Sequence, residues 1–278
     1  MNPRFLRRLL AERSGAVGVA IVLAVALLAL LAPLLAPHSY DATDLLNAWA
    51  PPDAVNPLGT DKLGRDIASR LIYGARVSLA VSLSVLAITM LVGVTAGLIA
   101  GYLGGRVDAV VMRIVDIVLA FPEVVLAILV AAVLGPGILT VIVALSLVWW
   151  PGIARLTRSL VLAQKQELYI DAAIACGTRA PAILRRHILP NIAGALLVRA
   201  SVGVGFIIMA EATLSFLGLG VQEPVPSWGG MIRDGLPELR SDPILAVSGS
   251  VVIGVTIIGF NLLGDGLRDA LDPRLRRR

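Results

Sequence analysis

The sequence predicts an all-α integral membrane protein with six transmembrane helices. Hydrophobic residues make up 57% of the 278 residues, charged residues only 15%, and the mean hydropathy is +0.87. Soluble globular chains are nearer about 45–50% apolar and about 25% charged, and disordered chains are poorer still in apolar residues. Several apolar stretches that lack Lys and Arg reach the ~20 residues that a helix needs to cross a bilayer.

Six apolar segments mark the expected spans. The first is longer than the ~7–15 residues of a signal-peptide core, which favours a retained membrane anchor over a cleaved signal. A polar stretch, residues 37–76, separates it from the second span. The predicted spans are Gly15 to Ala36, Val77 to Gly101, Ile114 to Leu134, Ile138 to Ile153, Ala193 to Leu219 and Ile244 to Leu263.

The basic residues predict that both ends of the chain are cytoplasmic. Of the 24 basic residues, 22 are Arg, and 18 fall on the side of the N-terminus against 6 on the opposite side. Cytoplasmic loops carry the excess of Lys and Arg, so the arrangement is N-in and C-in, in the inner or plasma membrane. These residues are spread over loops that flank the membrane, and this excludes a nucleic-acid-binding domain.

Four glycines recur at every fourth position of the second span: Gly93, Gly97, Gly101 and Gly105. Such a ridge lets helix backbones approach closely in lipid. We expect it to pack against another helix of the same chain, with a partner subunit as the alternative.

No catalytic chemistry is found in the sequence. There is no Gly-rich loop followed by Lys that would bind the phosphates of a nucleotide. Two histidines, His38 and His187, are too few for a multi-histidine metal site, and Cys176 has no second cysteine with which to form a disulfide. We therefore expect no enzyme activity and no bound cofactor or metal in this chain.

The inner loop of about 35 residues before the fifth span is too long for a simple connection. Its segment 166–179 predicts a helix, because Glu167 and Asp171 suit the positive end of a helix dipole and Gly177 provides a stop. The alternative is an amphipathic helix on the membrane surface, but two adjacent alanines make a poor lipid anchor.

This loop resembles the Glu-Ala-Ala loop of ABC importer permeases. Asp171, Ala172 and Ala173 are followed at the family's spacing by Gly177 and by a Leu-Pro pair, and the matching positions are Asp171, Ala172, Ala173, Gly177, His187, Leu189 and Pro190. Asp171 replaces the usual Glu and keeps its carboxylate. His187 replaces an Ile, as is common in the peptide-permease branch.

Further segments extend the resemblance from about Leu9 to Arg274: Pro57 to Asp66, Glu211 to Gly220, Pro226 to Met231 and Asn261 to Arg274. Together they resemble the "C" permease of dipeptide, oligopeptide and nickel importers. The resemblance implies the type I ABC importer transmembrane fold. It also implies an N-terminal extension (residues 1–75), a permease domain (76–264) with the coupling loop at about 166–190, and a cytoplasmic tail (265–278).

The resemblance implies a subunit that forms half of a translocation pathway for di- or oligopeptides. Its partners would be a homologous second permease, two ATPase subunits and an extracytoplasmic substrate-binding protein. ATP and Mg²⁺ would bind to the ATPases, and the loop would couple their movement to the helices. The alternative is a self-contained secondary transporter or channel, which would need an ion-coupling site of its own.

Two carboxylates lie within predicted spans, where a charge is costly and usually faces a cavity or a partner. Glu211, with Ser215 one turn later, is a candidate to line the outer part of the pathway, or it is structural. Glu123 follows Pro122 and either lines the pathway or satisfies backbone groups at a proline kink. Trp228, in the last outer loop, is expected to anchor at the membrane interface.

Overall fold

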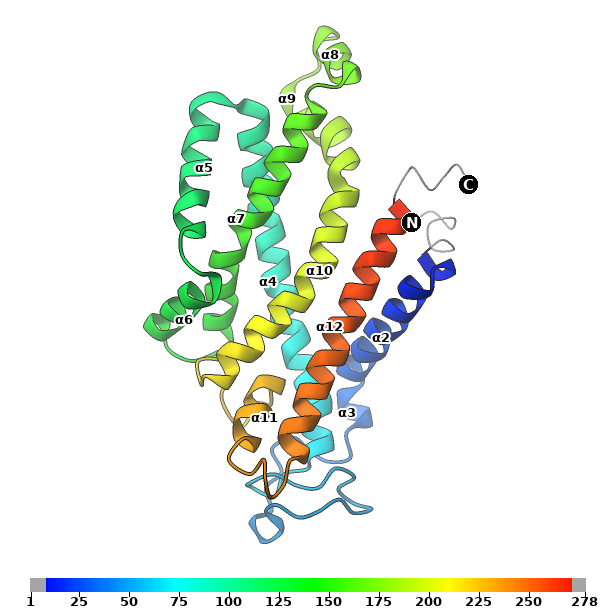
Figure 1. The fold of residues 1–278 in the computed structure, drawn as a ribbon, viewed down its shortest axis with the longest axis vertical. Coiled ribbons are helices and arrows are strands. Elements are labelled where there is room, and N and C mark those ends of the chain that lie inside the picture. The colour runs from blue at the N-terminus through cyan, green and yellow to red at the C-terminus, as the bar shows by residue number, and fades with distance from the viewer. Residues whose placement is uncertain (1–8, 272–278) are drawn as a thin grey trace.

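The computed structural model describes residues 9–271, so half of the predicted tail, residues 272–278, lies outside the described residues. Within this range every regular element is helical, and five helices are long and apolar enough to cross a membrane. A bent pair of helices provides a sixth span, which agrees with the predicted fold class (Figure 1). The helices are α2 (Arg13–Leu30), α3 (Ala32–Leu35), α4 (Ile67–Leu103), α5 (Gly105–Leu119), α6 (Glu123–Leu134), α7 (Ile138–Gln164), α8 (Leu168–Ala175), α9 (Ala180–Ile183), α10 (Leu189–Phe216), α11 (Trp228–Gly235) and α12 (Ile244–Leu271), with short turns η1 (Leu45–Asn47) and η2 (Leu184–Ile188).

The third predicted span is a bent pair of helices and not one straight helix. α5 and α6 meet at an angle of 85°. The chain turns at Phe121, because a residue before proline is driven out of the helical region of backbone space, and Pro122 then precedes the first turn of α6. The apolar segment from Ile114 to Leu134 therefore consists of the end of α5, a sharp turn and α6.

α4 is the central helix, and α7 packs along it (Figure 1). Gly93, Gly97 and Gly101 are buried in this contact, where an added Cβ would meet α7 atoms such as the Ala154 carbonyl oxygen or the Thr157 side chain. The ridge thus faces a helix of the same chain. Gly105 departs from it, because it lies in the turn into α5 with φ of +52° and an added Cβ there would meet nothing.

α5 is attached to α7 by charged side chains. The Arg158 guanidinium pairs with Asp108, and Arg155 Nη2 lies 2.6 Å from Asp116 Oδ1. A guanidinium can bind both oxygens of a carboxylate at once, which fixes geometry as well as distance. These two ion pairs hold α5 alongside α7, up to the sharp turn that follows α5.

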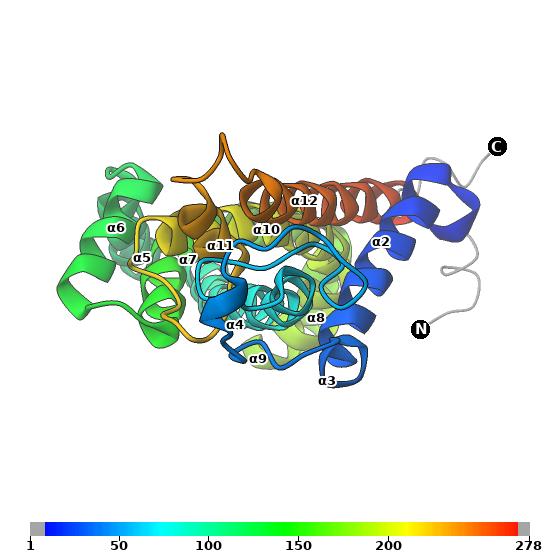
Figure 2. The same cartoon turned by 90° about the horizontal axis from the view of Figure 1, so that it is seen from below.

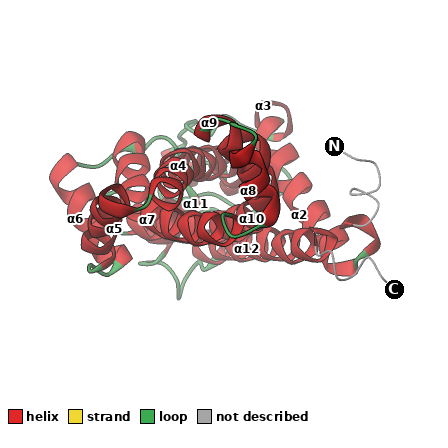
Figure 3. Cartoon of the chain, turned by 90° about the horizontal axis from the view of Figure 1, so that it is seen from above, coloured by secondary structure: helices red, strands yellow, loops and turns green. Residues whose placement is uncertain are grey.

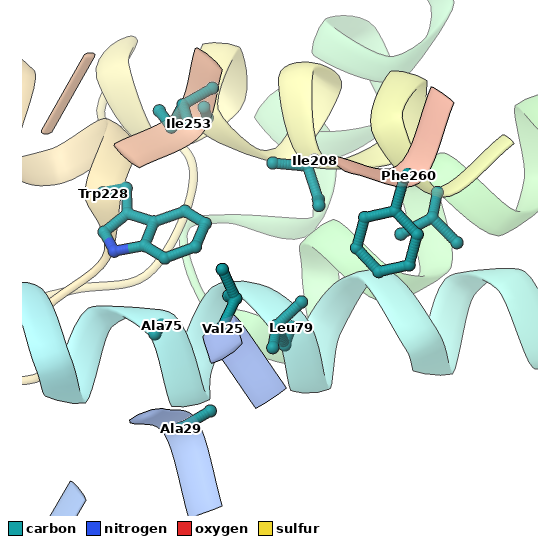
Figure 4. Close-up of a cluster of buried hydrophobic side chains, with 10 residues drawn as sticks. Val25, Ala29, Ala75, Leu79, Ile208, Trp228, Ile253 and Phe260 are labelled. Carbon is teal, nitrogen blue, oxygen red and sulfur yellow. The ribbon is translucent and has the colours of Figure 1, made fainter. Parts of the chain in front are cut away.

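One part of the core forms where α2, α4, α10, α11 and α12 meet. Trp228 fills its centre, together with Ile208, Ile253 and Phe260 (Figure 4). Trp228 is fully buried and its Nε1 donates a hydrogen bond to the Leu71 carbonyl oxygen at 3.1 Å. The predicted interfacial anchor is therefore a core residue, whose indole N–H finds a partner as a buried tryptophan requires.

The two ends of the bundle differ. α8, the start of α2 and the end of α12 lie at one end, and the long connection from α3 to α4 lies at the other with α11 (Figure 1). Seen from below, this connection lies across the ends of the helices (Figure 2). Seen from above, α8 and α9 lie apart from α5 and α6 (Figure 3). The motif-bearing loop therefore forms a distinct projection.

The contact between α4 and α7 yields a stability prediction. Gly97→Ala places a methyl group against the Ala154 carbonyl and Thr157, so we expect destabilisation by about 1–3 kcal/mol, as for other overpacked sites. The apparent melting temperature of the purified chain in mild detergent would report it. Gly254→Ala is the matched control, because its new Cβ meets nothing within 4 Å. Equal melting temperatures for the two variants would contradict the packing account.

Candidate functional site

α8 lies between α7 and α10, with one face packed on the protein. Ile170 is fully buried and Ala173 nearly so. They contact an apolar cluster from the end of α7, from α9 and from the base of α10; its buried members are Val161, Ile170, Ala173, Ile183, Ile188, Ile192 and Leu196. This cluster attaches the helix to the two long helices that flank it.

The opposite face of α8 is open. Leu168 is 84% exposed and Ile174 53% exposed, and Asp171 and Ala172 are exposed beside them. The two motif alanines therefore have different environments, because successive side chains of a helix point about 100° apart. Ala172 faces outward and Ala173 packs inward. A projecting helix with exposed apolar side chains, a small Ala and a carboxylate is suited to a groove on a partner protein.

α8 is shorter than the predicted helix 166–179. It ends where Gly177 takes φ of +74°, a left-handed conformation that favours glycine at a helix C-terminus. The N–H of Thr178 then bonds the Ala173 carbonyl at 3.1 Å, and the N–H of Gly177 bonds that of Ile174 at 2.9 Å. An added Cβ at Gly177 would meet nothing within 4 Å. The motif therefore needs glycine here for its backbone conformation and not for space.

The Leu189–Pro190 pair lies where α10 begins. Proline has no N–H and its ring crowds the carbonyl four residues earlier, which disfavours regular α-helix before it. The preceding turn, η2, is instead a wider π-helical turn in which the N–H of Leu189 bonds the Leu184 carbonyl. Leu189 also packs against the apolar cluster. His187 is half-buried in η2, and its ring lies 6.4 Å from that of Tyr169 in α8.

Glu211 and Ser215 are fully buried between α10 and α4. Ser215 Oγ donates to Glu211 Oε1 at 2.8 Å, and Ser78 Oγ of α4 donates to Glu211 Oε2 at 3.1 Å. In this conformation the carboxylate is enclosed by hydroxyl groups of its own chain. Sequence reasoning missed Ser78, which is far from Glu211 along the chain.

Glu123 lies apart from this pair, at the start of α6. Its side chain is exposed, and it borders a small cavity of about 30 Å³ that Leu145, Trp149 and Leu214 also line. Its position in the first turn places a carboxylate at the positive end of the helix. Of the two predicted intramembrane carboxylates, only Glu123 is open in this conformation.

The opposite end of the bundle contains a cluster of ion pairs. Arg65 and Asp61 are each 2% exposed and pair at 2.7 Å (Nε to Oδ2). Lys62 Nζ lies 2.9 Å from Glu223 Oε1 and 3.4 Å from Asp234 Oδ1. The outer charge cluster comprises Asp61, Lys62, Arg65, Arg70, Glu223 and Asp234.

Comparison with known proteins identifies the family of this chain. The model of the binding-protein-dependent transport system inner membrane component matches residues 93–277. The chain belongs to this family. The model of the N-terminal TM domain of oligopeptide transport permease C matches residues 4–52 of the permease. Its relatives are permeases of ABC importers, and a secondary transporter is not supported.

Characterised relatives align with nearly the whole permease. The oligopeptide transport system permease protein OppC of Bacillus subtilis is 41% identical, over 97% of this chain and 88% of its own. The dipeptide transport system permease protein DppC of the same species is 42% identical, over 98% and 85%. The glutathione transport system permease protein GsiD of Pectobacterium atrosepticum is 42% identical, over 98% and 90%.

A solved structure shares the fold. A chain of the inward-facing MetNI methionine ABC transporter superposes with a TM-score of 0.58 at 19% identity. The superposition covers 73% of the permease and 97% of that chain.

The outer charge cluster makes the stability of the permease depend on pH. Burial raises the pKa of Glu223, but the hydrogen bond from Lys62 and the positive charges of Arg65 and Lys62 outweigh this and lower the pKa to about 2. A lowered folded-state pKa stabilises the fold at pH above the unfolded value of about 4.3, and this contribution is lost as the pH falls toward 2.

We therefore expect Glu223→Gln to melt at a lower temperature than wild type at pH 7, with the gap narrowing between pH 4.5 and pH 2. Thermal unfolding in detergent across this range measures it. Glu238→Gln, at a half-buried residue that forms no ion pair among the described residues, is the control. A gap that stays constant down to pH 2 would contradict the assignment.

Proposed function

We propose that this permease is the subunit of an ATP-driven peptide importer that receives the movement of the ATPases through α8. The observation that carries this is the geometry of α8. It projects from the end of the bundle with Leu168, Asp171 and Ala172 exposed, yet it is fixed to α7 and α10 by buried side chains. A docking element has to be open to its partner and firmly attached to what it moves.

The chemistry of ATP hydrolysis belongs to the partner subunits in this proposal, where ATP and Mg²⁺ bind. The exposed apolar side chains of α8 would enter a groove on one of the two ATPases, and Asp171 would pair with a basic side chain at its rim. Closure of the ATPases would then displace α8 and, through the apolar cluster, the base of α10. The pathway would turn from inward-facing to outward-facing by rigid-body movement.

The proposed assembly contains this permease, a homologous second permease, two ATPase subunits and an extracytoplasmic substrate-binding protein. The permease would lie N-in and C-in. That orientation places α8, the start of α2 and the end of α12 on the cytoplasmic side, where the excess of basic residues lies. The outer charge cluster and the α3–α4 connection would face the substrate-binding protein.

The proposed substrates are di- or oligopeptides. The relatives at 41–42% identity carry names that specify oligopeptide, dipeptide and glutathione transport, and glutathione is itself a tripeptide. Glu123 is the stronger candidate for a pathway carboxylate, because its side chain is open. Glu211 would enter the pathway only in another conformation, because Ser78 and Ser215 enclose it in this one.

The role of Glu211 can be tested by Glu211→Gln, which keeps the size of the side chain and removes its charge. If Glu211 lines the pathway, we expect peptide uptake by the reconstituted importer to fall and its pH dependence to change. Normal uptake at every pH would leave it as a structural residue that joins α4 to α10. Glu123→Gln in the same assay provides the comparison.

The coupling role makes a prediction about assembly. Asp171→Arg reverses the charge on the open face of α8, so we expect the ATPases to be lost when the tagged chain is purified from its native membrane in mild detergent, with the second permease retained. Mass spectrometry of the co-purified proteins measures this. Asp41→Arg makes the same reversal at the other end of the bundle and should keep the ATPases. Retention of the ATPases by both Asp171→Arg and Asp41→Arg would contradict the proposed coupling role.

A further inference from the structure

We infer that Asn191 is a positioning residue that fixes the rotation of α8 relative to α10. This inference rests on the proposed coupling role of α8. The geometry joins four elements, α7, α8, η2 and α10. Asn191 Nδ2 donates to Tyr169 Oη of α8 at 3.1 Å and to the His187 carbonyl of η2 at 2.6 Å. Tyr169 Oη in turn donates to Gln164 Oε1 at the end of α7.

The amide group of asparagine suits this position because it has two N–H donors. One bonds a backbone carbonyl and the other a side chain of the neighbouring helix, so both bonds form together. Aspartate would have no N–H to donate. Alanine would leave the hydroxyl of Tyr169 bonded on one side only. The bridge therefore depends on the amide and not merely on a polar residue.

The π-helical turn explains why the bridge is found here. Pro190 supplies no N–H to the preceding turn, and η2 widens so that its hydrogen bonds span five residues. Asn191 follows this proline directly. Its side chain bonds the His187 carbonyl and so links the first turn of α10 back to η2. The base of α10 is thereby held at the point where α8 pushes on it.

The bridge and the apolar cluster have different effects. The cluster holds α8 through Ile170 and Ala173, but apolar contacts are non-directional and allow the helix to roll. Hydrogen bonds are directional. The chain Gln164–Tyr169–Asn191 lies at the N-terminal end of α8 and fixes its rotation. A displacement of α8 then moves α10 as well, because α8 cannot rotate about its own axis instead.

The chain contains its own reporter. Cys176 is the sole cysteine, it is exposed, and it lies directly after α8. A nitroxide attached to it reports the mobility of α8 by electron paramagnetic resonance, without reference to any substrate. The same preparation, reconstituted with its partners, gives ATP hydrolysis and the uptake of a labelled dialanine or trialanine peptide.

The test compares Asn191→Ala and Tyr169→Phe with wild type, and Gln166→Ala is the control because that exposed side chain forms no hydrogen bond with another described residue. We expect both test variants to raise label mobility at Cys176. We also expect them to keep the ATPases bound while uptake per ATP falls about three- to tenfold, the scale of one or two lost hydrogen bonds. The double variant should cost less than the sum of the two single variants, because the two residues share the Asn191–Tyr169 bond.

Unchanged label mobility would overturn the inference, and so would raised mobility with wild-type uptake per ATP. A fall in uptake that Gln166→Ala also shows would overturn it as well. If the wild-type chain binds no ATPase, the proposed coupling function fails instead. A further outcome is that wild type binds ATPases and yet transports neither peptide. In that case the role of Asn191 is tested by label mobility and by ATP hydrolysis measured without peptide. Equal values of both in Asn191→Ala and wild type would contradict that role.

Discussion

The close approach of α4 and α7 is the contact on which the rest of the permease depends. Glycines at every fourth position of α4 let the two backbones meet along Gly93, Gly97 and Gly101. Association of helices in lipid relies on such packing, because burial of apolar surface gains little where the solvent is itself apolar. Two Arg–Asp pairs attach α5 to α7. α7 also ends next to α8, so the α4–α7 contact determines the position of α8.

The two ends of the bundle are held by different forces, which suits their proposed roles. At one end a charge cluster joins the α3–α4 connection to α11 through Lys62 and Asp234. Its Asp61–Arg65 pair is buried within the connection, and breaking a buried pair leaves an uncompensated charge, so this end is costly to rearrange. At the other end α8 is held by apolar contacts and one polar bridge, and its other face is open. One end is therefore stabilised by ion pairs within the chain, while the other has an exposed surface that a partner can bind.

Hydropathy predicted the fold class, and the resemblance of several sequence motifs predicted the family, because both depend on local patterns. A kink at Pro122 was predicted, but its size of 85° was not, since a hydropathy average does not register how far the chain turns. The buried state of Trp228 and the Glu211–Ser78 contact depend on residues far apart in the chain. The Leu-Pro pair was recognised as a motif, but the π-helical turn and the Asn191 bridge follow only from the backbone geometry around it.

The central claim is that the open face of α8 meets the ATPases. Cross-linking from Cys176, the sole cysteine of the chain, tests it directly in the complete complex purified in mild detergent. A short heterobifunctional reagent attached at Cys176 should yield products between this chain and the ATPase subunits, located by mass spectrometry within a groove on their surface, and Cys176→Ser should yield none. Products with the second permease or lipid alone, from a complex that contains the ATPases, would contradict the account.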